Sequence, residues 1–226
     1  MNNTPINLRI KFKKVGNLQY ISHLDLVRTM HKIVIRSKLP LWYTQGFNPK
    51  PKMVFAAPLS IGTESLAEFM DLRLDARVDV NLAVKALNNN MTDELVALEA
   101  YYPTTALTDL AWLAYTITIN SIGATAETAE LCNQAFSADS MIVTKKNSTD
   151  KVDIAPLIKE AHAAFVDGSI VISCILCASP SSFLNPEYVV KYLRTSCGVL
   201  TDENLMKESY SILRTDAYKA DMTEFR

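Results

Sequence analysis

The stretch Leu8-Arg9-Ile10-Lys11-Phe12-Lys13-Lys14 alternates apolar and basic side chains. Successive side chains of a β-strand point to opposite faces, so this period of two predicts a strand with one buried face and one basic face. Leu8, Ile10 and Phe12 are expected in the core. The basic residues expected to be available to a ligand are Arg9, Lys11, Lys13 and Lys14. The stretch therefore predicts a sheet with one covered face and one open face.

A helix is expected after this strand, with Ser22 as its N-cap and an end before Pro40. The helical period of 3.6 residues places one set of apolar residues on a single arc. These residues are Leu24, Val27, Met30, Val34 and Ile35. Arg28, Lys32 and Arg36 recur at every fourth position on the opposite side and form a basic ridge. The ridge fits either a phosphate-binding surface or an ordinary solvated helix face.

The next segment, residues 45–52, predicts a stiff exposed loop, because it contains one glycine and two prolines. Its candidate binding residues are Gln45, Phe47, Asn48, Lys50 and Lys52. An exposed aromatic ring beside amides and lysines is suited to stacking on an unpaired base and neutralising its phosphates. The alternative is a turn in which Phe47 folds back onto the core.

The order of predicted elements is strand, helix, strands, helix, strand, and it occurs twice along the 226 residues. This order predicts an α+β protein of two tandem ferredoxin-like (βαββαβ) layers with insertions. The boundary is expected at Pro103, which gives a basic N-terminal domain of residues 1–103 and an acidic C-terminal domain of residues 104–226. Residues 156–165 are expected to be a helical insertion in the second layer.

Charge is distributed unevenly between the two ends of the chain. Residues 1–52 contain ten lysines and arginines and a single acid, Asp25, for a net charge of +9. The other residues contain thirteen bases and twenty-three acids, for a net charge of −10. A local excess of this size commonly serves a polyanionic partner such as nucleic acid, although a solubilising basic shell is the alternative.

The four cysteines are interpreted as reduced core residues, because their spacing gives one close pair and a metal site needs a second. No motif for a cofactor or metal is found. No apolar run approaches the roughly 20 residues that cross a bilayer, and the polar first residues carry no signal-peptide pattern. The sequence therefore predicts a soluble, cytoplasmic protein with no cofactor and no membrane association.

His23, in the first turn of the predicted helix, is the weak candidate for a catalytic residue. A histidine near the basic strand could act as the general acid or base in RNA cleavage. The alternative is a packing or hydrogen-bonding role, and the positive end of the helix dipole disfavours the protonated form. No other catalytic residue is predicted.

Four motifs together resemble the radical-SAM-linked protein family, a domain of unknown function. They are residues 8–14, Ser22-His23-Leu24-Asp25-Leu26, Gln45-Gly46-Phe47-Asn48-Pro49 and Pro58-Leu59-Ser60-Ile61-Gly62. The match is dense over residues 8–75 and looser beyond. The resemblance implies a radical SAM protein as partner, either fused or encoded separately, often near a ribonuclease of the E/G type. This chain has no Cys-x-x-x-Cys-x-x-Cys motif, so the resemblance makes it the companion of the enzyme. Lys50 stands where the family often has histidine or arginine.

Three functional hypotheses follow. The first is an RNA-binding accessory protein that presents transfer or ribosomal RNA to a separate radical SAM enzyme for modification or processing. The second is a metal-independent endoribonuclease that uses His23, because the tandem ferredoxin-like plan also resembles the repeat-cleaving ribonucleases of CRISPR systems. The third is a protein–protein adaptor whose basic face docks on the radical SAM partner.

Overall fold

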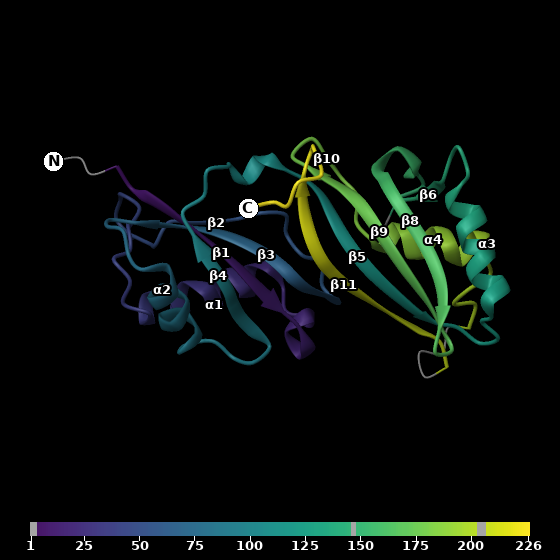
Figure 1. The fold of residues 1–226 in the computed structure, drawn as a ribbon, viewed down its shortest axis with the longest axis horizontal. Helices are drawn as coiled ribbons and strands as arrows, with labels where there is room; N and C mark the ends of the chain where they lie inside the picture. Colours follow the sequence, from purple (N-terminus) through teal and green to yellow (C-terminus); the bar gives the residue numbers. More distant parts are fainter. Residues whose placement is uncertain (1–3, 146–147, 203–206) are drawn as a thin grey trace. The chain divides into compact units, whose positions relative to one another are not determined.

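The computed structural model describes residues 4–145, 148–202 and 207–226. It is a mixed α/β protein with a large, mostly antiparallel sheet and, in the described residues, four α-helices (Figure 1). The chain divides into two compact units, residues 1–109 with Arg226 and residues 110–225. The sequence predicts the boundary between the two domains at Pro103. The prediction that the first residues form no signal peptide rests on residues 1–3, which lie outside the described residues.

Unit 1 packs two helices against one face of a four-stranded antiparallel layer whose strand order is β4-β1-β3-β2. The elements, in chain order, are β1 (Ile6–Lys14), a 3-10 helix (Gly16–Tyr20), α1 (His23–Arg36), β2 (Met53–Phe55), β3 (Thr63–Leu74), α2 (Val80–Asn88), β4 (Leu95–Tyr101) and a second 3-10 helix (Leu107–Asp109). The strand predicted from residues 8–14 is confirmed as the C-terminal part of β1, and the helix predicted after Ser22 is confirmed as α1.

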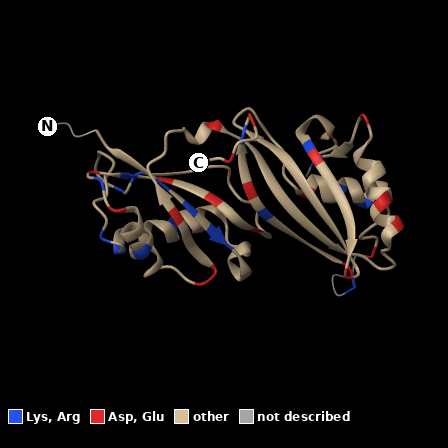
Figure 2. Ribbon diagram, viewed as in Figure 1, with Lys and Arg blue, Asp and Glu red and all other residues tan. Residues whose placement is uncertain are grey.

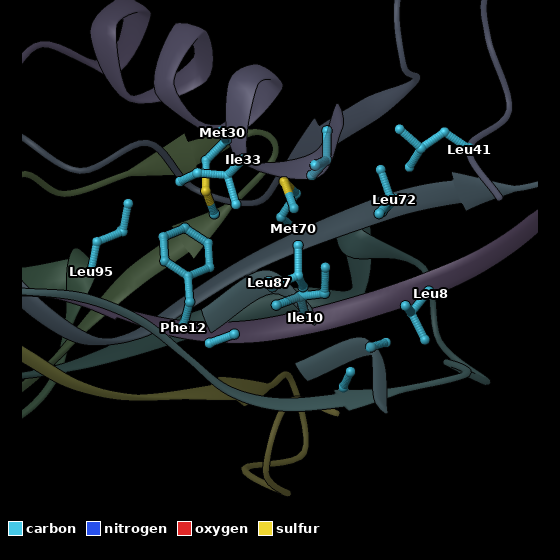
Figure 3. Close-up of a cluster of buried hydrophobic side chains, with 14 of the residues drawn as sticks. Leu8, Ile10, Phe12, Met30, Ile33, Leu41, Met70, Leu72, Leu87 and Leu95 are labelled. Carbon is cyan, nitrogen blue, oxygen red and sulfur yellow. The ribbon is translucent and has the colours of Figure 1, made fainter. Parts of the chain in front are cut away.

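The core of unit 1 lies between this layer and its helices (Figure 3). Leu8, Ile10 and Phe12 are fully buried, as the alternation predicted. They pack with side chains from both helices and from β3 and β4, including Met30, Ile33, Val34, Met70, Leu72, Leu87 and Leu95. The hydrophobic effect over this contiguous set is what fixes the helices to the sheet.

Helix α1 begins where the sequence predicts, because the Ser22 hydroxyl accepts a 3.1 Å hydrogen bond from the backbone N–H of Asp25. Its apolar arc was predicted only in part. Met30 and Val34 are buried, but the side chains of Leu24 and Ile35 are 56% and 51% exposed. Leu26 and Ile33 are buried instead. The buried face of α1 is therefore rotated about the helix axis toward these two residues, relative to the predicted face.

Unit 2 repeats the arrangement with the strand order β11-β5-β9-β8, all antiparallel. Its main elements are β5 (Leu110–Asn120), α3 (Ala126–Phe136), β8 (Ile158–Val166), β9 (Ser169–Ser179), α4 (Glu187–Ser196) and β11 (Ser209–Lys219). Its shorter elements are β6 (Ile142–Thr144), which pairs with β7 (Lys151–Asp153), a 3-10 helix (Ala155–Leu157), and β10 (Ser182–Phe183), which pairs with β9.

The prediction of a helix over residues 156–165 is wrong, because all but its first two residues lie in the edge strand β8. The residues from Lys159 to Ala164 are mostly good helix formers, which explains the prediction. Pairing with β9 outweighs this local preference, since tertiary context routinely overrides propensity. Because residues 158–166 form a strand, every second residue of this segment lies on the same face of the sheet.

The cysteines all carry free thiols, and Cys132 and Cys174 are buried. Burial raises the pKa of both of these thiols to about 12. Thiols held in the protonated form are poor nucleophiles and poor metal ligands. In the described part of the chain no helix is long and apolar enough to cross a membrane.

Candidate nucleic-acid interface

Arg9 is buried, so the prediction that it lies on an exposed basic face is wrong. Arg9 and Asp71 are directly opposite each other on β1 and β3. The guanidinium donates from Nε to Asp71 Oδ1 at 2.7 Å and from Nη2 to Asp71 Oδ2 at 3.0 Å. It also donates to the hydroxyl and the backbone oxygen of Thr105. A buried guanidinium needs such partners, so Arg9 stabilises the fold.

Lys14 is likewise buried, contrary to expectation. Its Nζ donates to the backbone oxygen of Leu18 at 3.0 Å, which ties the end of β1 to the 3-10 helix that follows. Lys11 and Lys13 are only half-buried, and the Lys11 ammonium lies 5.7 Å from the centre of the Phe69 ring. The basic residues of β1 therefore do not form the continuous exposed row that their alternation predicted.

The ridge on α1 is exposed as predicted. Arg28, Lys32 and Arg36 all face solvent. Arg28 forms a 3.1 Å ion pair with Asp25, and the Ser22 hydroxyl together with Arg28 lowers the pKa of this carboxyl. In the described chain neither Lys32 nor Arg36 has an acidic partner within ion-pair distance. Both cations are therefore available to phosphate.

The predicted loop is the tip of a short hairpin. Tyr43 and Pro51 form an antiparallel bridge, and the N–H of Thr44 donates to the backbone oxygen of Lys50 at 2.9 Å. The residues at the tip, 45–50, are all exposed. Phe47 is fully exposed, so its ring does not fold back onto the core. Gln45, Asn48, Lys50 and Lys52 are exposed beside it. The ring is therefore available for stacking on a partner.

The charge of the hairpin acts on α1 at His31. Partial burial lowers the pKa of His31, and the positive charge of Lys50 lowers it further. His31 is one helical turn from both Arg28 and Ile35. We use the name α1–hairpin surface for Leu24, Arg28, His31, Lys32, Ile35, Arg36 and the hairpin residues 43–52. This surface lies entirely within the basic part of unit 1 (Figure 2).

His23 packs against the aromatic ring of Phe55. Its imidazole meets the ring of Phe55 edge to face, with centroids 5.5 Å apart and an interplanar angle of 87°. The contact joins the first turn of α1 to β2. Among the described residues no titratable side chain forms a hydrogen bond or ion pair with His23. This geometry favours the packing role over the catalytic one.

Unit 2 contains a hollow of about 220 Å³ that was not predicted. Its lining includes Glu160 and His162 from β8, Ser173 from β9, Thr116 from β5 and Thr215 from β11. Glu160 and His162 are two residues apart, a spacing that places both on one face of a strand. In the helix predicted for residues 156–165 these two side chains would lie on different sides, so the pattern did not indicate a shared site. In the described chain no group of three or more His, Cys, Asp and Glu side chains could hold a metal ion.

Residues 7–186 match the family described as an uncharacterized protein conserved in bacteria (DUF2344), and the chain belongs to this family. No curated protein sequence matches it. The fold is similar to a chain in the crystal structure of a Cbf5-Nop10-Gar1 complex, with a TM-score of 0.52 and 12% identity. That similarity covers 95% of this chain but 50% of the other chain, so this chain spans half the length of that relative. A weaker similarity, with a TM-score of 0.24 and 11% identity, is to an unknown protein from Galdieria sulphuraria, over 93% of this chain and 99% of that one.

Proposed function

We propose that this protein binds RNA through the α1–hairpin surface and works as an accessory to a separate radical SAM enzyme in RNA modification or processing. The observation that carries the proposal is the fully exposed ring of Phe47, in a hairpin whose Lys50 acts electrostatically on the helix that carries the exposed Lys32 and Arg36. Exposed aromatic rings stack on unpaired bases, and neighbouring cations neutralise the phosphates of the same strand.

The hairpin is suited to binding at a low entropic cost. The bridge between Tyr43 and Pro51 and the hydrogen bonds between Thr44 and Lys50 hold its base. Pro49 and Pro51 limit the backbone freedom that would otherwise be lost on binding. The amides of Gln45 and Asn48 add donors and acceptors for base edges. Phosphate contacts would set the affinity, and these amides would contribute selectivity.

The proposed architecture is a ferredoxin-like layer in each unit. It is supported by the strand orders β4-β1-β3-β2 and β11-β5-β9-β8, in which the first strand lies between the third and the fourth. In such a layer the helices cover one face of the sheet. The α1–hairpin surface is then on the helical side of unit 1, and the RNA would not lie across the open face of that sheet.

The radical SAM partner is proposed from the sequence resemblance alone, which is densest over residues 8–75. Both parts of the α1–hairpin surface lie in that segment. The chain has cysteines only at positions 132, 174, 177 and 197, a spacing that does not supply a three-cysteine cluster motif. The iron–sulfur cluster would therefore belong to the partner.

A protein–protein adaptor is the second candidate. The observation that favours it is the exposure of Leu24 and Ile35, two large apolar side chains that flank Arg28 on the same surface. Apolar residues beside an arginine are typical of protein interfaces. An endoribonuclease is the third candidate, and the packing of His23 on Phe55 weighs against it.

The proposal is tested by fluorescence anisotropy with labelled single-stranded RNA. Phe47→Ala should weaken binding by the ~1–3 kcal/mol expected for one stacked base. Phe183→Ala removes a phenylalanine that is 44% exposed in unit 2, and it is the matched control that should leave the affinity unchanged. The RNA proposal fails if the wild-type protein binds no RNA at low salt. In that case, capture of the radical SAM protein by wild type but not by a Leu24→Ser/Ile35→Ser variant would support the adaptor.

A further inference from the structure

The hollow in unit 2 lies on the face of the sheet that the helices leave open. Along β9, Ile170, Ile172 and Leu176 are buried, whereas Ser173 is exposed and Ile175 is half-buried on the alternate face. Figure 1 shows α4 behind the strands of unit 2 and no helix in front of them. The hollow is therefore accessible, and its lining comes from all four main strands of the unit.

Strand register arranges the lining in two rows. His162, Ser173 and Thr116 are direct neighbours across β8, β9 and β5, so an imidazole and two hydroxyls form one row. Glu160, Ile175 and Ala114 are neighbours in the adjacent row, which continues to Asp216 on β11, so two apolar side chains lie between two acidic residues. The small side chain of Ala114 leaves room above the sheet. The result is a flat apolar floor beside hydrogen-bonding groups.

A positive charge and an indole ring lie near this hollow. The register between β8 and β9 shifts between Ile158 and Glu160, which leaves Lys159 at a bulge. Its ammonium lies over the Trp112 ring, 5.1 Å from the ring centre. Trp112 precedes Ala114 by two residues on β5 and so shares its face. A cation and an aromatic ring therefore flank the apolar row.

We infer that this hollow binds a single nucleobase, either of a free nucleoside or of an unpaired RNA residue; the second source rests on the proposed function. The volume is below the roughly 300–1,000 Å³ of pockets for drug-sized ligands, so it suits one ring system. A planar base fits the apolar floor, and its edge meets the hydroxyls of Ser173, Thr116 and Thr215.

The carboxylate of Glu160 determines which bases fit best. A carboxylate only accepts hydrogen bonds and repels phosphate, so it favours a base edge that carries N–H donors. Guanine presents an amino group beside a ring N–H, and cytosine and adenine each present an amino group, whereas the edge of uracil carries two carbonyls and a single N–H. Lys159, whose ammonium lies over Trp112, supplies the positive charge that can meet the phosphate following the bound base. The site therefore prefers guanosine and cytidine to uridine.

The test is an NMR titration of the labelled full chain with guanosine, cytidine and uridine, followed at the His162 imidazole and the Ser173 amide. Guanosine and cytidine should give saturable shifts. Ser173→Leu fills the hollow and should weaken binding by about tenfold or more, because the ligand loses its volume and one hydroxyl. Ser211→Leu is the matched control, since Ser211 is exposed on β11 but does not line the hollow. Thr116→Val, which removes a hydroxyl at constant volume, should weaken binding less than Ser173→Leu does.

The same variants separate this inference from the proposed function. Saturable nucleoside binding that Ser173→Leu abolishes supports the site, whether or not the chain binds RNA. If RNA binds through Phe47 while no nucleoside gives a saturable shift, or while Ser173→Leu changes nothing, the inference about the hollow is overturned and the proposed function stands. Glu160→Gln supports it further if the preference over uridine is lost, and equal affinity of the wild type for the three nucleosides overturns the assigned role of Glu160.

Discussion

Arg9 and Asp71 form a bidentate ion pair across β1 and β3, with Nε 2.7 Å from Oδ1 and Nη2 3.0 Å from Oδ2. The Arg9 side chain is completely buried, and 10% of the Asp71 side chain is exposed. Removal of one partner leaves the other charge buried without compensation. Arg9 therefore stabilises the fold, although its place in the basic stretch predicted that it would bind a ligand.

The first prediction is that Asp71→Ala lowers the free energy of unfolding by about 3–5 kcal/mol, the usual cost of breaking a buried pair. The double variant Arg9→Met/Asp71→Leu should be far closer to the wild type, because it leaves no buried charge. Chemical denaturation monitored by circular dichroism measures both. Equal losses for the single and double variants would show that the charge pair is not the source of the stability.

The alternation in residues 8–14 predicted the strand and its buried face correctly, because both depend on local periodicity. It could not reveal that Arg9 meets Asp71, 62 residues away, because register between distant strands is a tertiary property. The exposure of Phe47 was predictable, since glycine and two prolines favour a loop at the surface. The helix predicted over residues 156–165 was wrong, because local propensity favoured a helix whereas pairing with β9 makes the segment a strand.

The second prediction concerns two asparagines that bond to the backbone of edge strands. Asn88 donates to the oxygen of Ala97 at 2.9 Å and accepts from its N–H at 2.8 Å. Asn133 makes the same two bonds with Ala163, at 3.0 and 2.7 Å. Asn88→Ala and Asn133→Ala should each cost ~1–3 kcal/mol, because backbone groups of β4 and β8 are left without their partners. The exposed asparagine Asn89 forms no such bonds, and Asn89→Ala is the control for thermal unfolding.

Removal of these asparagines should also promote self-association. Unpaired edge groups of β4 or β8 can pair with another chain. Light scattering at high protein concentration should show more aggregation for both variants than for Asn89→Ala. If all three variants remain equally monodisperse, the asparagines do not protect the strand edges.

The third prediction concerns pH and the placement of the hairpin. Partial burial and Lys50 hold the pKa of His31 below its ordinary value of 6.5, so the folded state favours the neutral imidazole. A histidine whose folded pKa is depressed loses stability as the pH falls through the unfolded pKa, because only the unfolded chain takes up the proton readily. Lys50→Ala should raise the pKa of His31 in an NMR titration and reduce this acid sensitivity. An unchanged His31 pKa would place the hairpin away from α1.

The fourth prediction is that His23 has a packing role. His23→Ala should lower stability by roughly 0.5–1.5 kcal/mol beyond the effect of the smaller buried area, the usual worth of an aromatic pair, and should leave RNA affinity unchanged. Neither the wild type nor the variant should cleave hairpin RNA in the presence of a chelator. Cleavage by the wild type that His23→Ala abolishes, with binding retained, would instead establish the endoribonuclease.

The most direct test of the central claim is the salt dependence of RNA affinity. If Lys32 and Arg36 neutralise phosphates of a single strand, the slope of log affinity against log salt concentration should fall by about 0.7 for each phosphate that is no longer neutralised. Lys32→Ala/Arg36→Ala should therefore flatten the slope, whereas Lys85→Ala/Lys207→Ala, which removes two exposed charges elsewhere, should not. Equal slopes for the wild type and both double variants, or the same change in both, would contradict RNA binding at the α1–hairpin surface.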